Sequence, residues 1–450
     1  MEIENTSLWR EVLKVANSNE NNTHYALAAV IHLMASKQDY RAFKVIEFDI
    51  ERDYVNNYTD KIFIKVTMPI GDYAYQVYPN RSNLELSVVM SPRSEIGGDN
   101  NASAQRVERF AATLVDTGNP MVDITASNAP GQEAMNRRGF IDVQMQLVDK
   151  AAAMLRFAML GGIWRKATVE DVLKTVMVNE SRRILVDDKI ALQGVDMVPA
   201  HNTQVRDHIV IPQGIRLVDV PNYIQEKVGG IYSSGLGYYL YQGYWYIYPA
   251  YDVKRYNQTT RAVTIVNIPE NKMPGIERTY RKNGDNVVIL ATGKIKFNDP
   301  RKSNEQNFGN GARFSNANMF MGEFFTTEDN KSVTQQVDIT NEFVVDQQAT
   351  EKTFAPIAPE RITTNSYKQL SRLAQRRGAI FNLVWENSDP TLILPGTLAN
   401  ILYLSNGVVS SAIGVILKAH HFTAMEGQGF TDSRYVRRSI LTFFVESPVS

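Results

Sequence analysis

The chain has 450 residues, of which 44% are hydrophobic and 21% are charged, and it contains no cysteine. Lysine plus arginine equals aspartate plus glutamate at 48 each, so the composition indicates a folded globular protein without the basic footprint of a nucleic-acid or membrane-surface binder. The lack of cysteine excludes disulfides, thiolate catalysis and cysteine-ligated metals, and it favours folding in a reducing cytosol.

Length and hydropathy set the next limits. A chain this long exceeds one ordinary core, and we expect two to four domains. The sequence contains no apolar stretch of about 18 residues, so it predicts no transmembrane helix. The N-terminus lacks a basic segment followed by an apolar run, so the sequence predicts no signal peptide.

The first predicted segment, residues 1–39, is polar and then helical. The run His24–Lys37 (HYALAAVIHLMASK) predicts a helix, because alanine, leucine, valine and isoleucine cover most of its faces and Asn22 or Thr23 can cap it. Its histidines, His24 and His32, are interpreted as surface or packing residues.

Residues 40–165 predict a first β-barrel. Apolar and polar residues alternate in Lys61–Met68 and again in Leu84–Met90, which is typical of half-buried strands. The stretch 97–136 is rich in Gly, Asn, Ala and Ser and is interpreted as an insertion. Alternation returns at Phe140–Val148, which we expect to complete the same sheet.

Residues 166–256 predict a small central α/β module. Thr168-x-x-Asp171 resembles a capping box and starts a helix. A second, short helix has Pro221 near its first turn and Gly229–Gly230 as its stop. In Tyr238–Tyr251, eight of fourteen residues are Tyr or Trp, and their spacing around Gly243 predicts a β-hairpin.

The aromatic hairpin has two possible roles. Aromatic clusters most often form a core, because each ring buries a large area while a tyrosine hydroxyl stays at the edge. They can also form a platform for a ligand such as a sugar. The residues singled out as structural or interface candidates are Tyr232, Tyr239, Tyr241, Trp245, Tyr246, Tyr248, Pro395 and Gly396.

Residues 257–380 predict a second β-barrel, with strands at Ala262–Ile268, Val287–Ala291 and Gly293–Phe297 and a long loop at 298–334. A helix over Tyr367–Ala379 is expected to end at Gly378.

Residues 381–450 predict a C-terminal β segment. Its expected strands are Ile380–Trp385, Leu392–Leu394, Ala399–Tyr403, Val408–Ala419 and Arg438–Val445.

A search for catalytic patterns gives none that indicates an enzyme. The zinc-protease HExxH pattern, a phosphate-binding loop and a Gly-x-Ser-x-Gly elbow are missing from the sequence. His201 and His208 could contribute to a metal site, but no third ligand is specified. His420 and His421 would point to opposite faces of a strand and could not chelate together.

One carboxylate cluster keeps a second function class open. Asp49, Glu51 and Asp53 lie at two-residue spacing, and paired carboxylates can serve glycoside hydrolysis. A solvated strand face explains them as well. The alternative function is therefore a carbohydrate-binding or glycan-degrading protein that uses Tyr238–Tyr251 as a stacking platform and Asp49 and Glu51 as acids.

Several local patterns resemble the baseplate hub protein of contractile-tailed bacteriophages and related injection machines. They are Thr168–Glu180 (TVEDVLKTVMVNE), Ile211-Pro212-Gln213-Gly214 with Val220-Pro221-Asn222-Tyr223-Ile224, Gly229–Gly235 (GGIYSSG), Trp245–Pro249 (WYIYP), and Leu392–Gly396 (LILPG) followed by Ala399–Tyr403 and Gly414–Leu417. The likeness spans most of the chain, although each motif is short.

The resemblance implies a fold and a function. The implied fold is α+β and β-rich, with two tube-like antiparallel β-barrels flanking a small α/β module and a C-terminal β segment. The implied protein is a non-enzymatic virion subunit without cofactor, a homotrimer that adapts the sixfold tail tube to the threefold spike. Its implied partners are a tube protein or tube initiator, the spike and other baseplate wedge proteins, with phage DNA only as a transient passenger and no membrane.

The same resemblance implies a location in the tail baseplate of the virion after assembly in the host cytoplasm. Another tail protein, such as a tube initiator or adaptor, stays open as an alternative. The polar stretches 97–136 and 298–334 are then candidate contact arms.

Overall fold

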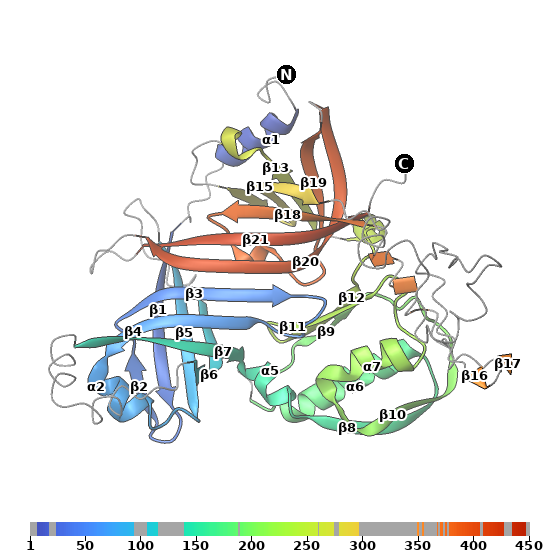
Figure 1. Ribbon diagram of the computed structural model, residues 1–450, viewed down its shortest axis with the longest axis horizontal. Helices are drawn as coiled ribbons and strands as arrows, with labels where there is room; N and C mark the ends of the chain where they lie inside the picture. Colours follow the sequence, from blue (N-terminus) through green and yellow to red (C-terminus); the bar gives the residue numbers. More distant parts are fainter. Residues whose placement is uncertain are drawn as a thin grey trace.

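The computed structural model describes residues 7–17, 24–93, 106–115, 139–187, 190–259, 261–273, 279–296, 349–350, 353–354, 367, 370–371, 374–375, 378–405, 408–426 and 434–446. Figure 1 shows two β-rich regions, one above the other, with a smaller α/β region beside the lower one. The described part of the chain is therefore β-rich with few helices.

Six strands close into a barrel in the upper region. In ring order they are β13 (Ala262–Asn267), β19 (Leu398–Ser405), β20 (Val408–Glu426), β21 (Arg434–Glu446), β18 (Gly378–Glu386) and β15 (Asn286–Lys296). A parallel pairing of β13 with β15 closes the ring, and β13 is also parallel to β19, so the barrel is not purely antiparallel. Large side chains fill its core, among them Phe381, Trp385 and Phe443.

The lower region is a second run of paired strands, which is joined to β20 at one end and to β21 at the other. Its order is β3 (Lys44–Asp53), β4 (Lys61–Pro69), β7 (Phe140–Asp149), β6 (Arg106–Leu114), β5 (Leu84–Arg93) and β1 (His24–Leu33). β3 pairs with β20, and β1 meets β21 at the single register pair Tyr25–Tyr435. Phe48, Ile64, Val66 and Met145 are fully or almost fully buried between these strands.

The long strands β20 and β21 belong to both regions. The first part of β20 pairs with β19 and the second part, from Lys418, pairs with β3. A register shift between Ile416 and Lys418 separates the two parts. Because a β-bulge bends a strand and re-aims its hydrogen bonds, this irregularity lets one strand serve both regions. Figure 1 shows β3, β20 and β21 side by side across the middle of the molecule.

The α/β module occupies the side of the lower region. Its elements are α5 (Lys150–Leu155), β8 (Met159–Ala167), α6 (Val169–Ile184), β9 (Gly194–Met197), β10 (Arg206–Arg216), α7 (Val220–Lys227), β11 (Leu236–Tyr241) and β12 (Tyr244–Pro249). The two helix predictions are confirmed. Thr168 Oγ1 accepts a hydrogen bond from the Asp171 amide at 3.1 Å at the start of α6, and Pro221 lies in the first turn of α7.

Short elements complete the described fold: α1 (Ser7–Ala16), β2 (Gln38–Arg41), α2 (Ile70–Asp72), the π-helix Tyr73–Val77, β14 (Tyr280–Asn283), β16 (Ala349–Thr350), β17 (Thr353–Phe354), and 3-10 turns at Leu217–Asp219, Lys254–Gln258, Glu270–Lys272 and Pro390–Leu392. The apolar stripe of α1 packs Leu8, Val12 and Val15 against Val266 and Leu290 on the outside of the barrel. Among the described helices, none has the length and apolar character needed to cross a bilayer.

The structure corrects the N-terminal prediction. His24–Leu33 is not part of a helix but the strand β1, and the described N-terminal helix lies earlier, at Ser7–Ala16. Leu27, Ala29, Ile31 and Leu33 are buried at a spacing of two, which is a strand period. The alanine content suggested a helix, but pairing with both β5 and β2 determines the local structure.

Two further predictions also need correction. Gly378 does not cap the predicted helix but begins β18, where a Cβ would lie 2.1 Å from the Phe444 ring, whereas the described residues 367, 370–371 and 374–375 of the predicted segment are helical. The stretch 97–136 is not only an insertion, because β6 (Arg106–Leu114) lies within it, between β5 and β7. The predicted loop 298–334 and the stretches 97–105 and 116–136 lie outside the described residues.

The C-terminal strands enter the same closed barrel as β13 and β15. The sequence had divided this region at residue 380, between a second barrel and a C-terminal segment. Strand β18 spans that position and pairs with β15 on one side and β21 on the other.

Candidate functional site

The aromatic hairpin predicted from the sequence is present. β11 and β12 pair in register from Leu236–Pro249 to Tyr241–Tyr244, and β9 adds to β12 in parallel. The turn residues Gln242 and Gly243 both have positive φ, at 52° and 77°. A two-residue turn of this kind matches the right-handed twist of the strands, which explains the glycine at this point.

The two faces of the hairpin fill two different cores. Tyr238, Leu240, Trp245 and Ile247 pack into the core of the α/β module. Tyr239, Tyr241 and Tyr248 point the other way, into the core of the six-stranded barrel. Because successive residues of a strand face opposite sides, one short hairpin ties the module to the barrel.

Burial rules out the hairpin as a sugar-stacking platform. Trp245 and Tyr239 are 0% exposed, and the Trp245 indole donates a hydrogen bond to Ser181 Oγ at 3.1 Å. Tyr244 is the one aromatic residue of the hairpin that is exposed, at 41%. Apart from Tyr244, the aromatic residues of β11 and β12 are buried or partly buried, so the hairpin does not offer the stacking platform that the carbohydrate alternative requires.

Two further candidate residues, Tyr232 and Tyr246, lie at the same hairpin. Tyr232 is fully buried, its hydroxyl donates to the Val198 carbonyl, and the Ile247 carbonyl oxygen lies 3.3 Å from the same hydroxyl. Tyr246 is partly buried beside the barrel core. Burial raises the pKa of Tyr246 to about 12, so its phenol is neutral in any ordinary buffer.

The turn Pro395–Gly396 is placed directly against Tyr248. A Cβ on Gly396, which has φ +71°, would lie 2.7 Å from the Tyr248 ring, so only glycine fits. Arg255 stacks over the same ring at 5.6 Å and donates from Nη2 to the Gly396 carbonyl at 2.7 Å. The sequence singled out Tyr248, Pro395 and Gly396 separately, and the structure brings Tyr248 and Gly396 into contact.

A buried charge network, missed by the sequence analysis, joins the hairpin to β3. Arg52 is 3% exposed and forms an ion pair with Asp60 at 3.2 Å. Tyr239 donates to Asp60 Oδ1 at 2.6 Å, and the Arg52 guanidinium stacks on the Tyr241 ring at 4.5 Å. Burial works to lower the pKa of Arg52, but the combined attraction of Asp60 and the nearby tyrosine hydroxyls outweighs it, so the pKa is raised and the guanidinium stays charged.

His421 continues this network into the shared strands. Burial and the nearby Arg52 and Arg437 hold the pKa of His421 well below its usual value, so the ring is neutral at physiological pH. Arg52 lies 3.4 Å from Nε2, which therefore accepts, and Nδ1 donates to Ser439 Oγ at 2.6 Å. The two-residue period of β3 could have identified Arg52, because this residue lies on the same face of the strand as the buried Phe48 and Ile50.

The three candidate acids on β3 do not form a catalytic pair. Asp49 contacts His420 on the outer face, and Glu51 lies 3.4 Å from Lys61. Asp53 is 7% exposed and accepts hydrogen bonds from the Asn56 amide and side chain while Lys418 lies at 2.6 Å. His420 and His421 point to opposite faces of β20, as predicted: the side chain of His420 is 44% exposed, whereas His421 as a whole residue is 1% exposed.

His201 and His208 are not brought together on a ligand set. His201 Nδ1 lies 2.9 Å from Ser233 Oγ, and its Nε2 lies 3.8 Å from Asp252. His208 lies on β10 opposite Arg165. Within the described part of the chain, no group of three His, Asp or Glu side chains is arranged to hold a metal ion.

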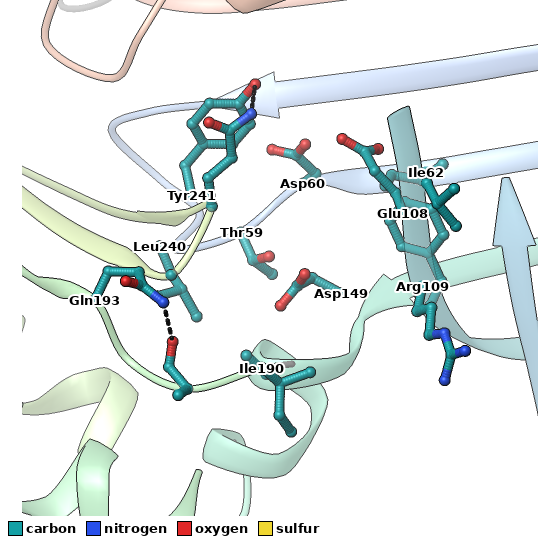
Figure 2. A pocket seen from close by; sticks show the side chains of 16 residues that line it. Thr59, Asp60, Ile62, Glu108, Arg109, Asp149, Ile190, Gln193, Leu240 and Tyr241 are labelled. Atoms are coloured by element: carbon teal, nitrogen blue, oxygen red, sulfur yellow. Dashed lines mark hydrogen bonds between the residues drawn. The ribbon is translucent and has the colours of Figure 1, made fainter. Parts of the chain in front are cut away.

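A pocket of ≈ 560 Å³ opens beside the hairpin turn, between the lower strands and the module. Figure 2 shows three carboxylates facing this space: Asp60 ahead of β4, Glu108 on β6 and Asp149 at the start of α5. Burial, together with the charges of Asp60 and Glu108, raises the pKa of Asp149 to about 6. The Asp149 side chain also caps α5 by accepting from the Ala152 amide at 3.0 Å.

Comparison with known proteins gives no match to a family model or, by sequence, to a curated protein. Among solved structures, a tail protein from Neisseria meningitidis MC58 is similar at 11% identity, with 93% of this chain and 96% of that chain covered and a TM-score of 0.44. A 43 kDa tail protein of prophage MuSo2 from Shewanella oneidensis is similar at 10% identity, with 93% of this chain and 96% of that chain covered and a TM-score of 0.43.

A third similar structure is an E. coli protein described as a component of the type VI secretion system that is structurally similar to bacteriophage T4 tail proteins. It has 10% identity and a TM-score of 0.40 over 90% of this chain and 74% of that one. With TM-scores below 0.5, these likenesses do not assign a fold or a function to the chain.

Proposed function

We propose that this chain is a non-enzymatic structural subunit of a contractile phage tail baseplate, the central hub that adapts a sixfold tail tube to a threefold spike. One observation carries the proposal: β20 and β21 run through two β-rich regions and join them without a linker. A subunit that must present two tube-like units at a fixed angle needs this kind of connection.

In this proposal the second tube-like barrel is the run β3-β4-β7-β6-β5-β1. Its support is the pairing at both ends, β3 with β20 and β1 with β21, and the separate apolar core that these strands enclose. Three subunits with two barrels each then supply six barrels in a ring. A ring of identical subunits also suits a chain of net charge zero, since it closes without strong self-repulsion.

The candidate residues have a structural role in this scheme. Tyr239, Tyr241 and Tyr248 fix the barrel to the hairpin, Trp245 fixes the module, and the Pro395–Gly396 turn closes over Tyr248. The partners are a tube protein or tube initiator on one side, the spike on the other and wedge proteins around the rim, within the virion. Phage DNA passes through the ring and does not bind tightly.

The decisive experiment measures the mass of the purified protein by light scattering and images the same peak by negative-stain microscopy. We expect threefold rings at three times 50.8 kDa, either alone or after mixing with candidate spike or tube protein. A compact monomer that stays monomeric with every candidate partner contradicts the hub assignment.

A further inference from the structure

The two-stranded ribbon formed by β8 and β10 has one face in the core of the α/β module and one outer face. Trp164 and Ile209 lie opposite each other on the inner face, where Ile209 is fully buried and Trp164 packs against the module core. Ile163 and Val210, the next register pair, point the other way because successive strand residues alternate. Figure 1 shows α6 and α7 above the ribbon and no described helix or strand below it in that view. The outer face is therefore open within the described structure.

Large apolar side chains gather on this outer face. Ile163 is 64% exposed and Val210 is 48% exposed. Met159 lies in the same row of β8, Phe157 precedes it by two residues, and both are exposed as well. A single exposed apolar residue is ordinary, but a group of them on one pair of strands marks an interaction surface.

The two strands of the ribbon differ in how their free edges are protected. β10 contains Pro212, which has no amide hydrogen to offer a neighbour, and a register shift between Ile211 and Ile215. The Tyr223 hydroxyl on α7 also donates to the Val210 carbonyl at 3.4 Å. β8 has no proline, and among the described strands it pairs only with β10. The free edge of β8 is therefore the one that is open to another strand.

Positive charge on the outer face has no acid to balance it. Arg165 lies opposite His208 in this row, is exposed and makes no ion pair with a described residue, and the neighbouring Lys166 is exposed too. The one acid of the two strands, Asp207, lies in the inner row with Ile209. A second copy of β8 at this edge would add another arginine beside the first, whereas an acidic segment would form a charge-assisted hydrogen bond with it.

We propose that β8 accepts, along its free edge, an extended acidic segment of a neighbouring protein as an added strand. Side chains two positions apart in that segment share one face, so a carboxylate beside Arg165 places an apolar side chain beside Ile163. The backbone ladder supplies affinity, and this pair of side chains supplies specificity. The proposal does not depend on the hub role.

Fluorescence anisotropy of labelled heptapeptides with the full chain tests the proposal. The probe is Thr-Val-Thr-Glu-Thr-Val-Thr, which offers the same pattern in either strand direction. One control peptide has Lys in place of Glu. The other carries methyl groups on two successive backbone nitrogens, one of which has to face β8 because successive amides point to opposite edges.

The peptides should separate clearly in about 0.15 M salt, where loose surface attraction is screened. We expect the probe to saturate the protein with a Kd below about 1 mM, the lysine peptide to bind at least about tenfold more weakly, and the methylated peptide not to bind. Hydrogen-exchange mass spectrometry should show that the probe protects amides of β8, because the added strand covers its unpaired groups.

Three variants locate the binding on the ribbon. Arg165→Glu should weaken binding of the probe by about tenfold or more and should bind the lysine peptide better than the wild type does. Ile163→Thr keeps a β-branched side chain on the strand and should weaken binding by about fivefold through lost apolar contact. The matched control Val186→Thr, at an exposed apolar residue outside the ribbon, should leave the affinity unchanged.

A second copy of the chain is the rival occupant of this edge. If Arg165→Glu or Ile163→Thr lowers the mass of the purified protein in light scattering, the edge joins copies of the chain and the proposal is wrong. It is overturned equally if no peptide saturates the protein at about 1 mM, if either control peptide binds as tightly as the probe, or if Val186→Thr weakens binding as much as Ile163→Thr.

Discussion

Two largely buried carboxylates that line the same pocket, Asp60 and Asp149, differ in how their charge is stabilised. Asp60 accepts from Tyr239 and pairs with Arg52, so its charge is stabilised by direct partners. Asp149 accepts from backbone amides at the start of α5 and faces two other acids, and its pKa rises to about 6. At the scale of single residues, the stability of this junction should therefore respond to pH through Asp149.

The sign follows from linkage. The ordinary pKa of Asp149 is 3.8 and its folded value is about 6, so the folded protein holds this proton more tightly than the unfolded chain. The free energy of unfolding therefore falls as pH rises from about 4 to about 6 and stays lower above that range. We expect Asp149→Asn to be more stable than the wild type by about 1–3 kcal/mol at pH 7.5 and equally stable near pH 3.5.

Urea unfolding at the two pH values measures this difference, with Glu180→Gln as the control for the loss of one exposed charge. The control should lie within about 0.5 kcal/mol of the wild type at both values. An Asp149→Asn variant that is less stable than the wild type at pH 7.5 contradicts the burial argument, because Asn retains the cap.

At the scale of elements, the sequence predicts structure best where periodicity and turn chemistry agree. The hairpin has alternating aromatic residues and a Gln242–Gly243 turn, and both its strands were found. β1 was predicted as a helix because its alanines hide the alternation of Leu27, Ala29, Ile31 and Leu33. Long-range pairing with β5 and β2 decides that segment, and no local signal contains this information.

The candidate site shows the same limit. The sequence could identify Tyr248 and the Pro395–Gly396 turn, which carry strong local signals, but not that they touch. Arg52 and Asp60 were not predicted, because a buried ion pair becomes visible only when strand and turn are placed together. Asp49 and Glu51 drew attention instead, and they are solvated side chains on the outer face.

The Pro395–Gly396 turn gives the sharpest prediction at this scale. Gly396→Ala places a methyl group 2.7 Å from the Tyr248 ring and also strains a backbone at φ +71°. We expect a loss of about 2–4 kcal/mol in the free energy of unfolding, of which about 1 kcal/mol is backbone strain and the rest is overpacking. Urea or thermal unfolding measures the sum.

Gly214→Ala separates the two contributions. Gly214 has φ +93°, but a Cβ there would meet nothing within 4 Å, so only the backbone cost of about 1 kcal/mol applies. If both variants lose the same stability, the contact between Gly396 and Tyr248 does not constrain the turn, and the packing argument fails.

At the scale of the whole molecule, three connections join the barrel, the lower strands and the α/β module into one unit. β20 and β21 pass through both regions, the hairpin fills both the barrel and the module core, and Arg52 links β3 to the hairpin and to His421. Regions joined by a flexible linker would unfold separately. Here the connections are themselves strands and side-chain contacts, so a substitution that destabilises one core should also destabilise the other.

Calorimetry of two core variants tests this coupling. Phe48→Ala empties the core of the lower strands and Phe381→Ala empties the barrel core, where each ring is 0% exposed. Each should cost about 3–5 kcal/mol, and both should shift one shared unfolding transition at fixed protein concentration. Val408→Ala, at a side chain that is 65% exposed on β20, should shift it by less than about 0.5 kcal/mol. Two transitions, each moved by only one of the core variants, would show that β20 and β21 connect independent domains, and a fixed angle between two tube-like units would then lack its physical basis.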